Sequence, residues 1–313
     1  MAINKFMLAA LRALSYPDLD IKQNYLVDRK IKSLARPSIK AISRMAEFTL
    51  ETVTVPLECA VFLPPRIESD DVIMYFHGGG WVAGDIYSYT PTCRTLARFS
   101  GRTIVSVNYR RAPEHKFPAA VEDCYSAALA LLEGKSLLRV DERHLVLAGD
   151  SAGGNIAAAV SLMAADRGEF RVRRQVLIYP ALANDHGEDS PFESVHVNGT
   201  DYLLTSKRVD DYMALYSGDE SDYSNPYFAP LLAENLSGQP KTLIITAEYD
   251  PLRDEGEAYA ERLREAGVEV ELHRFPDALH GFFTLPSRFA QVKAAHNIIR
   301  AFLDETSYDE KMG

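Results

Sequence analysis

A serine lies at the centre of the stretch of sequence that most clearly indicates chemistry. The apolar run Leu145–Ala148 ends abruptly at Gly-Asp-Ser-Ala-Gly, residues 149–153, and an alanine-rich helical pattern follows at once. This pattern predicts a strand, a tight turn and a helix, with Ser151 at the tip of the turn. Gly149 and Gly153 lack a Cβ and so leave room for a serine in a strained backbone conformation. The alternative is an ordinary strand-to-helix turn in which Ser151 is the N-cap.

A serine hydroxyl becomes a good nucleophile only when a neighbouring base accepts its proton and a carboxylate orients that base. After a strand-turn-helix serine the partners follow in the chain order Asp or Glu, then His. Asp250 comes soon after the predicted strand Thr242–Thr246 and is our candidate for the acid, although an aspartate before Pro251 is also a common helix N-cap. Asp254 is the weaker candidate, because an acid in a first helical turn simply suits the helix dipole.

Three histidines follow this acid. His273 falls on the polar face of a predicted strand and His296 lies inside the last predicted helix, so neither has a reason to face the serine. His280 lies in a loop directly after that strand, and Gly281 beside it allows a close turn. We therefore predict that His280 is the base that serves Ser151.

A run of glycines is the second feature that indicates chemistry. The segment His77-Gly78-Gly79-Gly80-Trp81 comes directly after the predicted strand Val72–Phe76. Consecutive glycines leave backbone N–H groups uncovered, and these can donate to a developing oxyanion together with the amide of Ala152. The alternatives are a flexible turn and a phosphate loop, but the lysine and the helix of a G-x-x-x-x-G-K-[ST] loop are missing. The sequence contains no cluster of His, Cys and Asp that suggests a metal site.

Short apolar strands alternate with amphipathic helices from residue 72 onward. Strands that are apolar throughout are buried on both faces, so the pattern predicts an α/β fold whose mostly parallel sheet is covered by helices on both sides. Before it, Phe48–Val55 and Cys59–Leu63 predict an antiparallel pair at a sheet edge. The other predicted elements are strands at Thr103–Val107, Gln175–Tyr179 and Val268–Phe275 and helices at 88–100, Ala119–Glu133, Pro251–Ala266 and Pro286–Leu303.

Two segments fall outside this alternation. The first 46 residues look helical, with a break near Arg36-Pro37, and a long polar insertion carries apolar residues at helical spacing (Val209, Tyr212, Met213 and Tyr216). An insertion of that length is usually functional, so we expect both segments to cover the carboxyl ends of the strands, where open α/β sheets bind ligands. The predicted division is cap helices at 1–46, core at 47–182, cap insertion at 183–224 and core at 225–313.

The composition limits the kinds of partner and the cellular compartment that we expect. A formal net charge of -10 over 313 residues argues against nucleic acid or an anionic membrane as the main partner. Cys59, Cys93 and Cys124 are odd in number and lack C-x-x-C spacing, which indicates reduced thiols. No stretch is apolar enough to span a bilayer, and the N-terminal segment lacks a convincing signal-peptide cleavage site. We therefore expect a cytoplasmic protein.

Together these motifs resemble the hormone-sensitive-lipase-like branch of the α/β-hydrolases, the bacterial family IV carboxylesterases. The matching stretches, between about residues 72 and 283, are His77–Gly84, Tyr109–Ala119, Gly149–Asn155, Ala247–Gly256 and His280–Phe282. Two positions depart from the family pattern: Arg111 stands where leucine is usual, and Asp277-Ala278 where Pro-Gly is common. The resemblance implies an α/β-hydrolase fold with a helical cap, and a structural role for His77. It also implies six functional residues, Ser151, His280 and Asp250 as a catalytic triad and the amides of Gly78, Gly79 and Ala152 as an oxyanion hole.

The function that this resemblance implies is a serine carboxylesterase that acts on small-molecule esters through an acyl-enzyme and needs no cofactor. Trp81 and Phe282 stand beside the predicted site, so we expect them to narrow the acyl pocket and favour short to medium chains. The alternatives are a deacetylase of sugars or xenobiotics, an amide hydrolase, and a non-catalytic ligand receptor on the same scaffold; the last usually lacks the histidine that is present here. We also expect a homodimer through the late strand Val268–Phe275, because an exposed sheet edge invites pairing and relatives pair there.

Overall fold

The computed structural model describes residues 12, 20–33, 45–136 and 138–305. Most of the predicted N-terminal helical segment, and its break at Arg36-Pro37, lie outside these residues. The first helix that can be traced is α2 (Ile21–Ser33).

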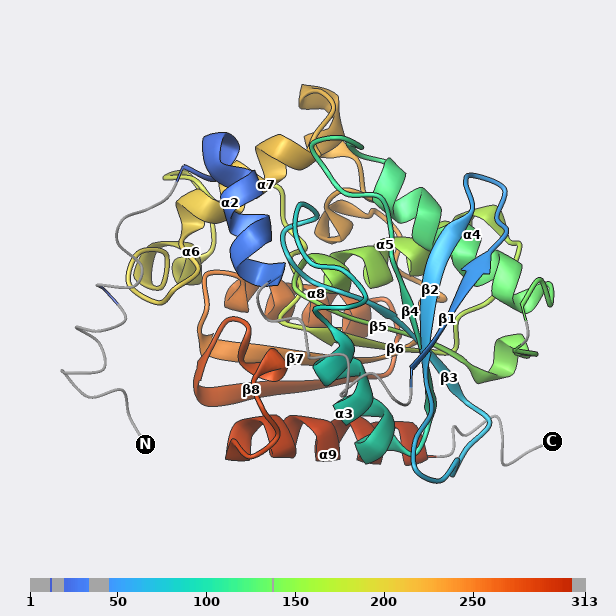
Figure 1. Cartoon of the computed structure of the whole chain (residues 1–313). Coiled ribbons are helices and arrows are strands. Elements are labelled where there is room, and N and C mark those ends of the chain that lie inside the picture. Colours follow the sequence, from blue (N-terminus) through green and yellow to red (C-terminus); the bar gives the residue numbers. More distant parts are fainter. Residues whose placement is uncertain (1–11, 13–19, 34–44, 137, 306–313) are drawn as a thin grey trace.

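An eight-stranded sheet runs through the centre of the molecule in the order β1-β2-β4-β3-β5-β6-β7-β8 (Figure 1). β2 pairs antiparallel with β1 and β4, and every other neighbouring pair is parallel. The predictions of a mostly parallel sheet and of an antiparallel edge pair are therefore confirmed. The strands are β1 (Met45–Leu50), β2 (Leu57–Phe62), β3 (Val72–Phe76), β4 (Thr103–Val107), β5 (Leu145–Asp150), β6 (Arg174–Ile178), β7 (Lys241–Tyr249) and β8 (Val270–Leu279).

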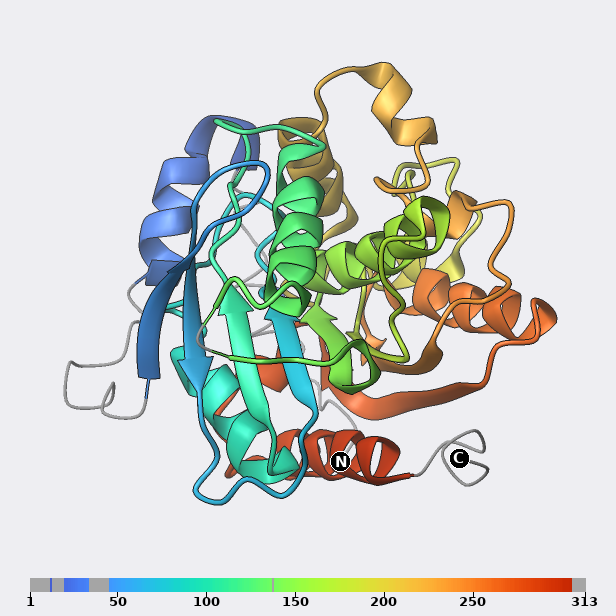
Figure 2. The same ribbon diagram turned by 90° about the vertical axis from the view of Figure 1, so that its right-hand side faces the viewer.

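Helices cover both faces of this sheet, as the continuous apolar strands predict. All five residues of β3, and all five of β4, are buried. α3 (Thr90–Ser100) and α9 (Ala290–Asp304) pack together on one face, and α4 (Ala119–Leu132), α5 (Ala152–Arg167) and α8 (Arg253–Glu265) lie on the other (Figure 2). Each face thus has its own apolar core, and the sheet separates the two.

Three helices lie beyond the carboxyl ends of the strands (Figure 1). α2 lies beside α7 (Ser206–Tyr216), and the short α6 (Glu193–Val197) packs against α8. The buried residues of α7 are Asp211 and the four residues whose spacing predicts a helix: Val209, Tyr212, Met213 and Tyr216. The remaining 3-10 turns are η2 (Glu142–His144), η3 (Glu220–Ser224), η4 (Pro230–Leu232) and η5 (Phe282–Thr284). The division into core and cap stays a prediction, but β1 begins at Met45, so the sheet starts slightly before its first boundary.

The last two strands are longer than the sequence predicts. β7 continues to Tyr249 instead of ending at Thr246, and β8 continues to Leu279 instead of Phe275. The added residues pair across an irregularity between Ala247 and Tyr249. Backbone pairing of this kind leaves no side-chain pattern, so alternation could not predict it. As predicted, β8 is the outer strand of the described sheet, and dimerisation through it stays a prediction.

Candidate active site

Ser151 stands at a sharp turn between β5 and α5. Its backbone has φ 56° and ψ -122°, a conformation that is costly for a residue with a side chain. The turn is as crowded as the glycines predict: a Cβ on Gly149 would lie 2.2 Å from the carbonyl oxygen of Gly153, and one on Gly153 would lie 2.0 Å from that of Phe76. The predicted strained turn is therefore present, and it lifts the serine to the carboxyl edge of the sheet.

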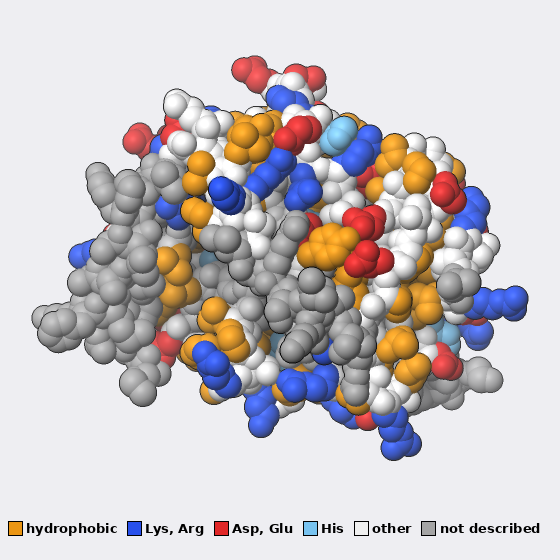
Figure 3. Space-filling model, in the orientation of Figure 1, with side chains coloured by type: hydrophobic (Ala, Val, Ile, Leu, Met, Phe, Trp, Pro, Cys, Tyr) orange, Lys and Arg blue, Asp and Glu red, His pale blue; other side chains and the backbone are white. Residues whose placement is uncertain are grey.

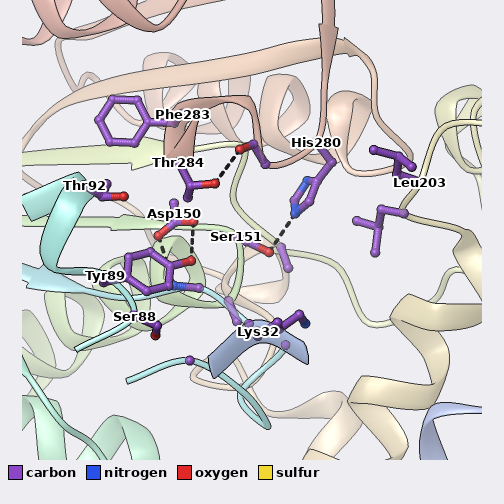
Figure 4. Close-up of a pocket in the computed structure, with 18 of the residues that line it drawn as sticks. Lys32, Ser88, Tyr89, Thr92, Asp150, Ser151, Leu203, His280, Phe283 and Thr284 are labelled. Carbon is purple, nitrogen blue, oxygen red and sulfur yellow. Dashed lines mark hydrogen bonds between the residues drawn. The ribbon is translucent and has the colours of Figure 1, made fainter. Parts of the chain in front are cut away.

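The structure brings the three predicted catalytic side chains together in one hydrogen-bonded chain. Nε2 of His280 lies 2.9 Å from Oγ of Ser151, and Nδ1 lies 2.7 Å from Oδ2 of Asp250. Figure 4 shows the imidazole of His280 aimed at the serine hydroxyl. Asp250 is fully buried, and its other oxygen accepts the amide hydrogen of Leu252 at 2.9 Å. The capping alternative for Asp250 is thus partly right, because one oxygen holds the turn before α8 while the other orients His280.

The rejected candidates lie elsewhere. The carboxylate of Asp254 accepts the amide hydrogen of Ser194 at 2.7 Å. His273 is half-buried on β8. His296 is buried in α9, where its Nδ1 donates to the carbonyl oxygen of Val292 at 2.8 Å. None of the three candidates is among the residues that line the cavity at Ser151.

The glycine loop differs from the prediction in one respect. The amide of Gly78 donates to Oδ1 of Asp150 at 3.0 Å, so this N–H is not available to an oxyanion. Within the described residues, the amides of Gly79, Gly80 and Ala152 have no hydrogen-bond acceptor, and all three residues line the cavity. The sequence places the loop correctly but cannot tell which of three identical glycines points its N–H outward, because that depends on the path of the backbone.

Asp150 is a site residue that the sequence reasoning missed. Its carboxylate is buried and accepts hydrogen bonds from the hydroxyls of Tyr75 at 2.8 Å and Tyr89 at 2.9 Å, besides the amide of Gly78 (Figure 4). Burial raises the pKa of Asp150, and these three donors oppose the shift. The available signal was an acid at the end of an apolar strand, immediately before the serine.

His77 is buried against the loop and does not face Ser151. Its Nδ1 donates to the carbonyl oxygen of Gly78 at 2.9 Å, and its ring stacks on Tyr109 with centroids 4.3 Å apart. Burial lowers the pKa of His77 to about 4, so the ring is neutral at pH 7. These contacts are those of a structural residue, as the resemblance implies.

A cavity of about 1110 Å³ opens onto Ser151. Trp81 lines it, and its indole stacks on Tyr216 at 4.8 Å and donates to Oδ1 of Asn155 at 3.2 Å. Phe282 does not line the cavity but packs in the core beside Tyr179, which corrects the expectation that it narrows the acyl pocket. Left-handed Gly281 (φ 83°) turns the chain there, so that the next residues reach the cavity instead: Phe283, Thr284 and Leu285.

The two segments that the sequence predicts to form a cap supply much of the remaining wall. Side chains of α2 and of the segment around α7 line the cavity, and Figure 4 labels two of them, Leu203 and Lys32 (Ile21, Asp28, Ile31, Lys32, Leu203, Leu204, Arg208, Val209 and Tyr212). The sequence predicts that these segments cover the site but does not predict which of their side chains face inward.

Figure 3 shows hydrophobic side chains at the surface in the region of α2, where Leu26, Val27 and Ile31 are exposed. No group of three or more His, Cys, Asp or Glu residues within the described part of the chain has the geometry to hold a metal ion.

Comparison with known proteins agrees with this architecture. The family described as alpha/beta hydrolase fold matches residues 73–284. The chain is 37% identical over 251 residues to an arylesterase of Saccharolobus solfataricus, covering 80% of each protein. It is 34% identical to an ethyl acetate hydrolase of Pseudomonas putida, covering 79% of this chain and 77% of the relative. A solved structure, the hyperthermophilic esterase from Pyrobaculum calidifontis, superposes with a TM-score of 0.84 at 37% identity, covering 100% of this chain and 99% of that one.

The match to the family extends over most of the chain and contains the serine turn, the glycine loop and the histidine loop. The described helices include none that is long and apolar enough to cross a membrane. The chain therefore belongs to the α/β-hydrolase fold family, in its hormone-sensitive-lipase-like branch.

Proposed function

We propose that this protein is a serine carboxylesterase that hydrolyses short- to medium-chain acyl esters of small molecules. One observation carries the proposal: Oγ of Ser151 lies 2.9 Å from Nε2 of His280, and Nδ1 of His280 lies 2.7 Å from Oδ2 of Asp250. Ser151 and His280 line the cavity. The similarity to proteins named arylesterase and ethyl acetate hydrolase supports the same reaction class. No bound cofactor enters the proposed chemistry.

In the proposed reaction the oxygen of Ser151 attacks the ester carbonyl carbon while His280 takes the hydroxyl proton. The carbonyl π electrons move to oxygen, and the buried carboxylate of Asp250 stabilises the imidazolium that forms. The carbonyl then re-forms as the bond between the acyl carbon and the alcohol oxygen breaks; His280 gives its proton to that oxygen, and the acyl group remains on Ser151. Water, deprotonated by the same histidine, attacks the acyl carbon to give a second oxyanion. Its collapse breaks the bond to Ser151, which recovers the proton from His280, and releases the acid.

The tetrahedral oxyanion needs donors that are already in place. We assign this role to the amides of Gly79, Gly80 and Ala152, which have no acceptor within the described residues. A donor of this kind typically contributes about 2.7–4 kcal/mol of transition-state stabilisation. Gly78, which the family resemblance placed in the oxyanion hole, is not assigned this role because its N–H donates to Asp150.

Cavity size bears on the substrate. A volume of about 1110 Å³ lies just above the usual range for small-molecule sites, so it accommodates medium as well as short chains. The three cysteines are free, buried thiols, which fits a reducing compartment and supports our proposal of a cytoplasmic location.

A non-catalytic receptor is less well supported than an enzyme, because the three side chains of the proposed triad are joined by hydrogen bonds.

The test is hydrolysis of p-nitrophenyl esters from acetate to long acyl chains by the wild type, Ser151→Ala and Ser126→Ala. Ser126 is a matched control, a buried serine on α4 whose hydroxyl has no partner among the described residues. We expect Ser151→Ala to lower kcat by several orders of magnitude and Ser126→Ala to leave it nearly unchanged. A folded wild type that is inert on every ester would contradict the proposal, and greater activity on acetylated sugars would favour the deacetylase.

A further inference from the structure

Tyr212 of the cap helix α7 lies directly on the glycine loop. A Cβ on Gly80 would meet Cγ of Tyr212 at 2.4 Å and the two neighbouring ring carbons at 2.6 and 2.7 Å. The ring therefore occupies the space that any side chain at residue 80 would need. Gly80 has a positive φ of 63°, so both its backbone conformation and its neighbour favour glycine.

The hydroxyl of Tyr212 is held by the other cap helix. It donates to Oδ2 of Asp28 at 2.9 Å and accepts from Nζ of Lys32 at 2.8 Å. Asp28 and Lys32 also pair with each other at 2.9 Å, one turn apart on α2. The three side chains thus form a closed triangle that joins α2 to α7 above the glycine loop. Tyr212 is only 7% exposed, and the side chains of Lys32 and Asp28 are 38% and 17% exposed, so the hydrogen bonds of the hydroxyl are partly buried.

Arg29, the residue after Asp28, fixes α2 on the same loop from another side. Its Nε donates to the carbonyl oxygen of Val82 at 2.5 Å, and its Nη2 donates to that of Ala112 at 2.6 Å. Both nitrogens at the end of its guanidinium also bond the carboxylate of Glu114. Val82 lies two residues beyond Gly80. Helix α2, which binds the hydroxyl of Tyr212, is therefore itself attached to the loop that Tyr212 covers.

From this geometry we propose that Tyr212 is a positioning residue that holds the Gly80 amide in place for the oxyanion, through its hydroxyl contacts with Asp28 and Lys32. The inference rests on the proposed esterase function. It makes the oxyanion hole depend on the docking of the cap: when α2 and α7 are joined, the tyrosine ring presses on the loop and fixes the direction of the Gly80 N–H. Without the hydroxyl contacts, the ring and the loop beneath it gain freedom.

The test compares Tyr212→Phe with Tyr227→Phe, because both variants remove a tyrosine hydroxyl that donates to an aspartate. Tyr227 bonds Asp166 at 2.6 Å and does not line the cavity. We expect Tyr212→Phe to lower kcat about 10- to 100-fold with KM changed less than about twofold, since a displaced donor is missed mainly in the transition state. Lys32→Met, which leaves the ring of Tyr212 intact, should also lower kcat.

A second measurement separates oxyanion stabilisation from ordinary packing. A trifluoromethyl ketone accepts Ser151 at its carbonyl carbon; the C=O π electrons become the oxyanion and His280 receives the proton. We expect Tyr212→Phe to weaken this inhibitor by the same factor as kcat/KM, while the affinity for the product carboxylic acid stays unchanged. Tyr227→Phe should alter neither quantity.

Two results would overturn the inference. One is wild-type kcat and wild-type ketone affinity in Tyr212→Phe. The other is a rise in KM alone, which would make Tyr212 a substrate contact. Failure of the esterase proposal gives different results: the wild type is inert on esters, or Ser151→Ala keeps its activity. Either of those results overturns both proposals.

Discussion

The amide of Gly78 donates to the carboxylate of Asp150 at 3.0 Å, which joins the glycine loop to the residue immediately before the serine. The bond spans two adjacent strand ends, since β3 and β5 are neighbours in the sheet. A Cβ on Gly78 would lie 2.7 Å from Oδ2 of Asp150, so the loop can approach this closely only with glycine. Serine turn and glycine loop are thereby held as one unit.

This bond predicts that Asp150→Ala damages both activity and stability. The substitution leaves three donors without this acceptor: the buried hydroxyl of Tyr75, the buried amide of Gly78 and the partly buried hydroxyl of Tyr89. We expect the free energy of unfolding to fall by about 2–4 kcal/mol and kcat to fall about 10- to 100-fold. Asp150→Asn keeps an acceptor oxygen and should lose less of each. Urea unfolding and ester kinetics measure the two effects, and wild-type kcat in Asp150→Ala would refute the coupling.

The choice between the two acid candidates can be tested by one pair of substitutions. Asp250→Asn keeps the side-chain shape but removes the charge that faces Nδ1 of His280, so kcat should fall by about 10³- to 10⁴-fold. Asp254→Asn changes a carboxylate that bonds Ser194, and kcat/KM should stay within about twofold of wild type. Steady-state kinetics on one ester decides, and equal losses in the two variants would contradict the assignment.

The serine turn predicts a contrast between two glycine substitutions. Gly153→Ala places a Cβ 2.0 Å from a backbone oxygen of β3, which cannot move without disturbing the sheet, so we expect a loss of about 3 kcal/mol in the free energy of unfolding. Gly168→Ala, at the end of α5, meets nothing within 4 Å and carries only the strain of φ 67°, a loss of about 1 kcal/mol. Denaturant titration compares them; equal losses would mean that the turn relaxes freely.

Because His296 is buried, we predict that the folded protein loses stability in acid. Burial lowers its pKa from 6.5 to about 4; its Nδ1 already donates to Val292, and a proton on Nε2 would find no acceptor among the described residues. The unfolded chain therefore binds this proton at a higher pH than the folded one, so stability is lost as pH falls below about 6.5. Between pH 7 and 4.5 this amounts to about 2–3 kcal/mol.

The control for this pH effect is His296→Phe, which can still stack on Phe283 as the histidine does, with centroids 4.4 Å apart. Urea unfolding of both proteins at pH 7 and pH 4.5 should show a smaller acid loss in the variant. If the two proteins lose the same free energy, His296 does not titrate in this range.

The sequence by itself was enough for the order of the elements and for the main chemical groups. Apolar strands, the Gly-Asp-Ser-Ala-Gly turn and the loop positions of Asp250 and His280 are local properties, because they depend on residue type and on neighbours a few positions away. From them the mostly parallel sheet follows, and so does the chain of contacts that joins Ser151, His280 and Asp250.

Only the tertiary structure decided which groups face the cavity. Gly78 and Gly80 are the same residue type in one loop, yet Asp150 takes the amide of one and Tyr212 covers the other. Phe282 and Phe283 are adjacent, yet only the second lines the cavity. The direction of an N–H or of a ring depends on backbone turns and on contacts between segments far apart in the chain, such as Asp28 and Tyr212. Residue spacing along a single sequence carries no record of those contacts.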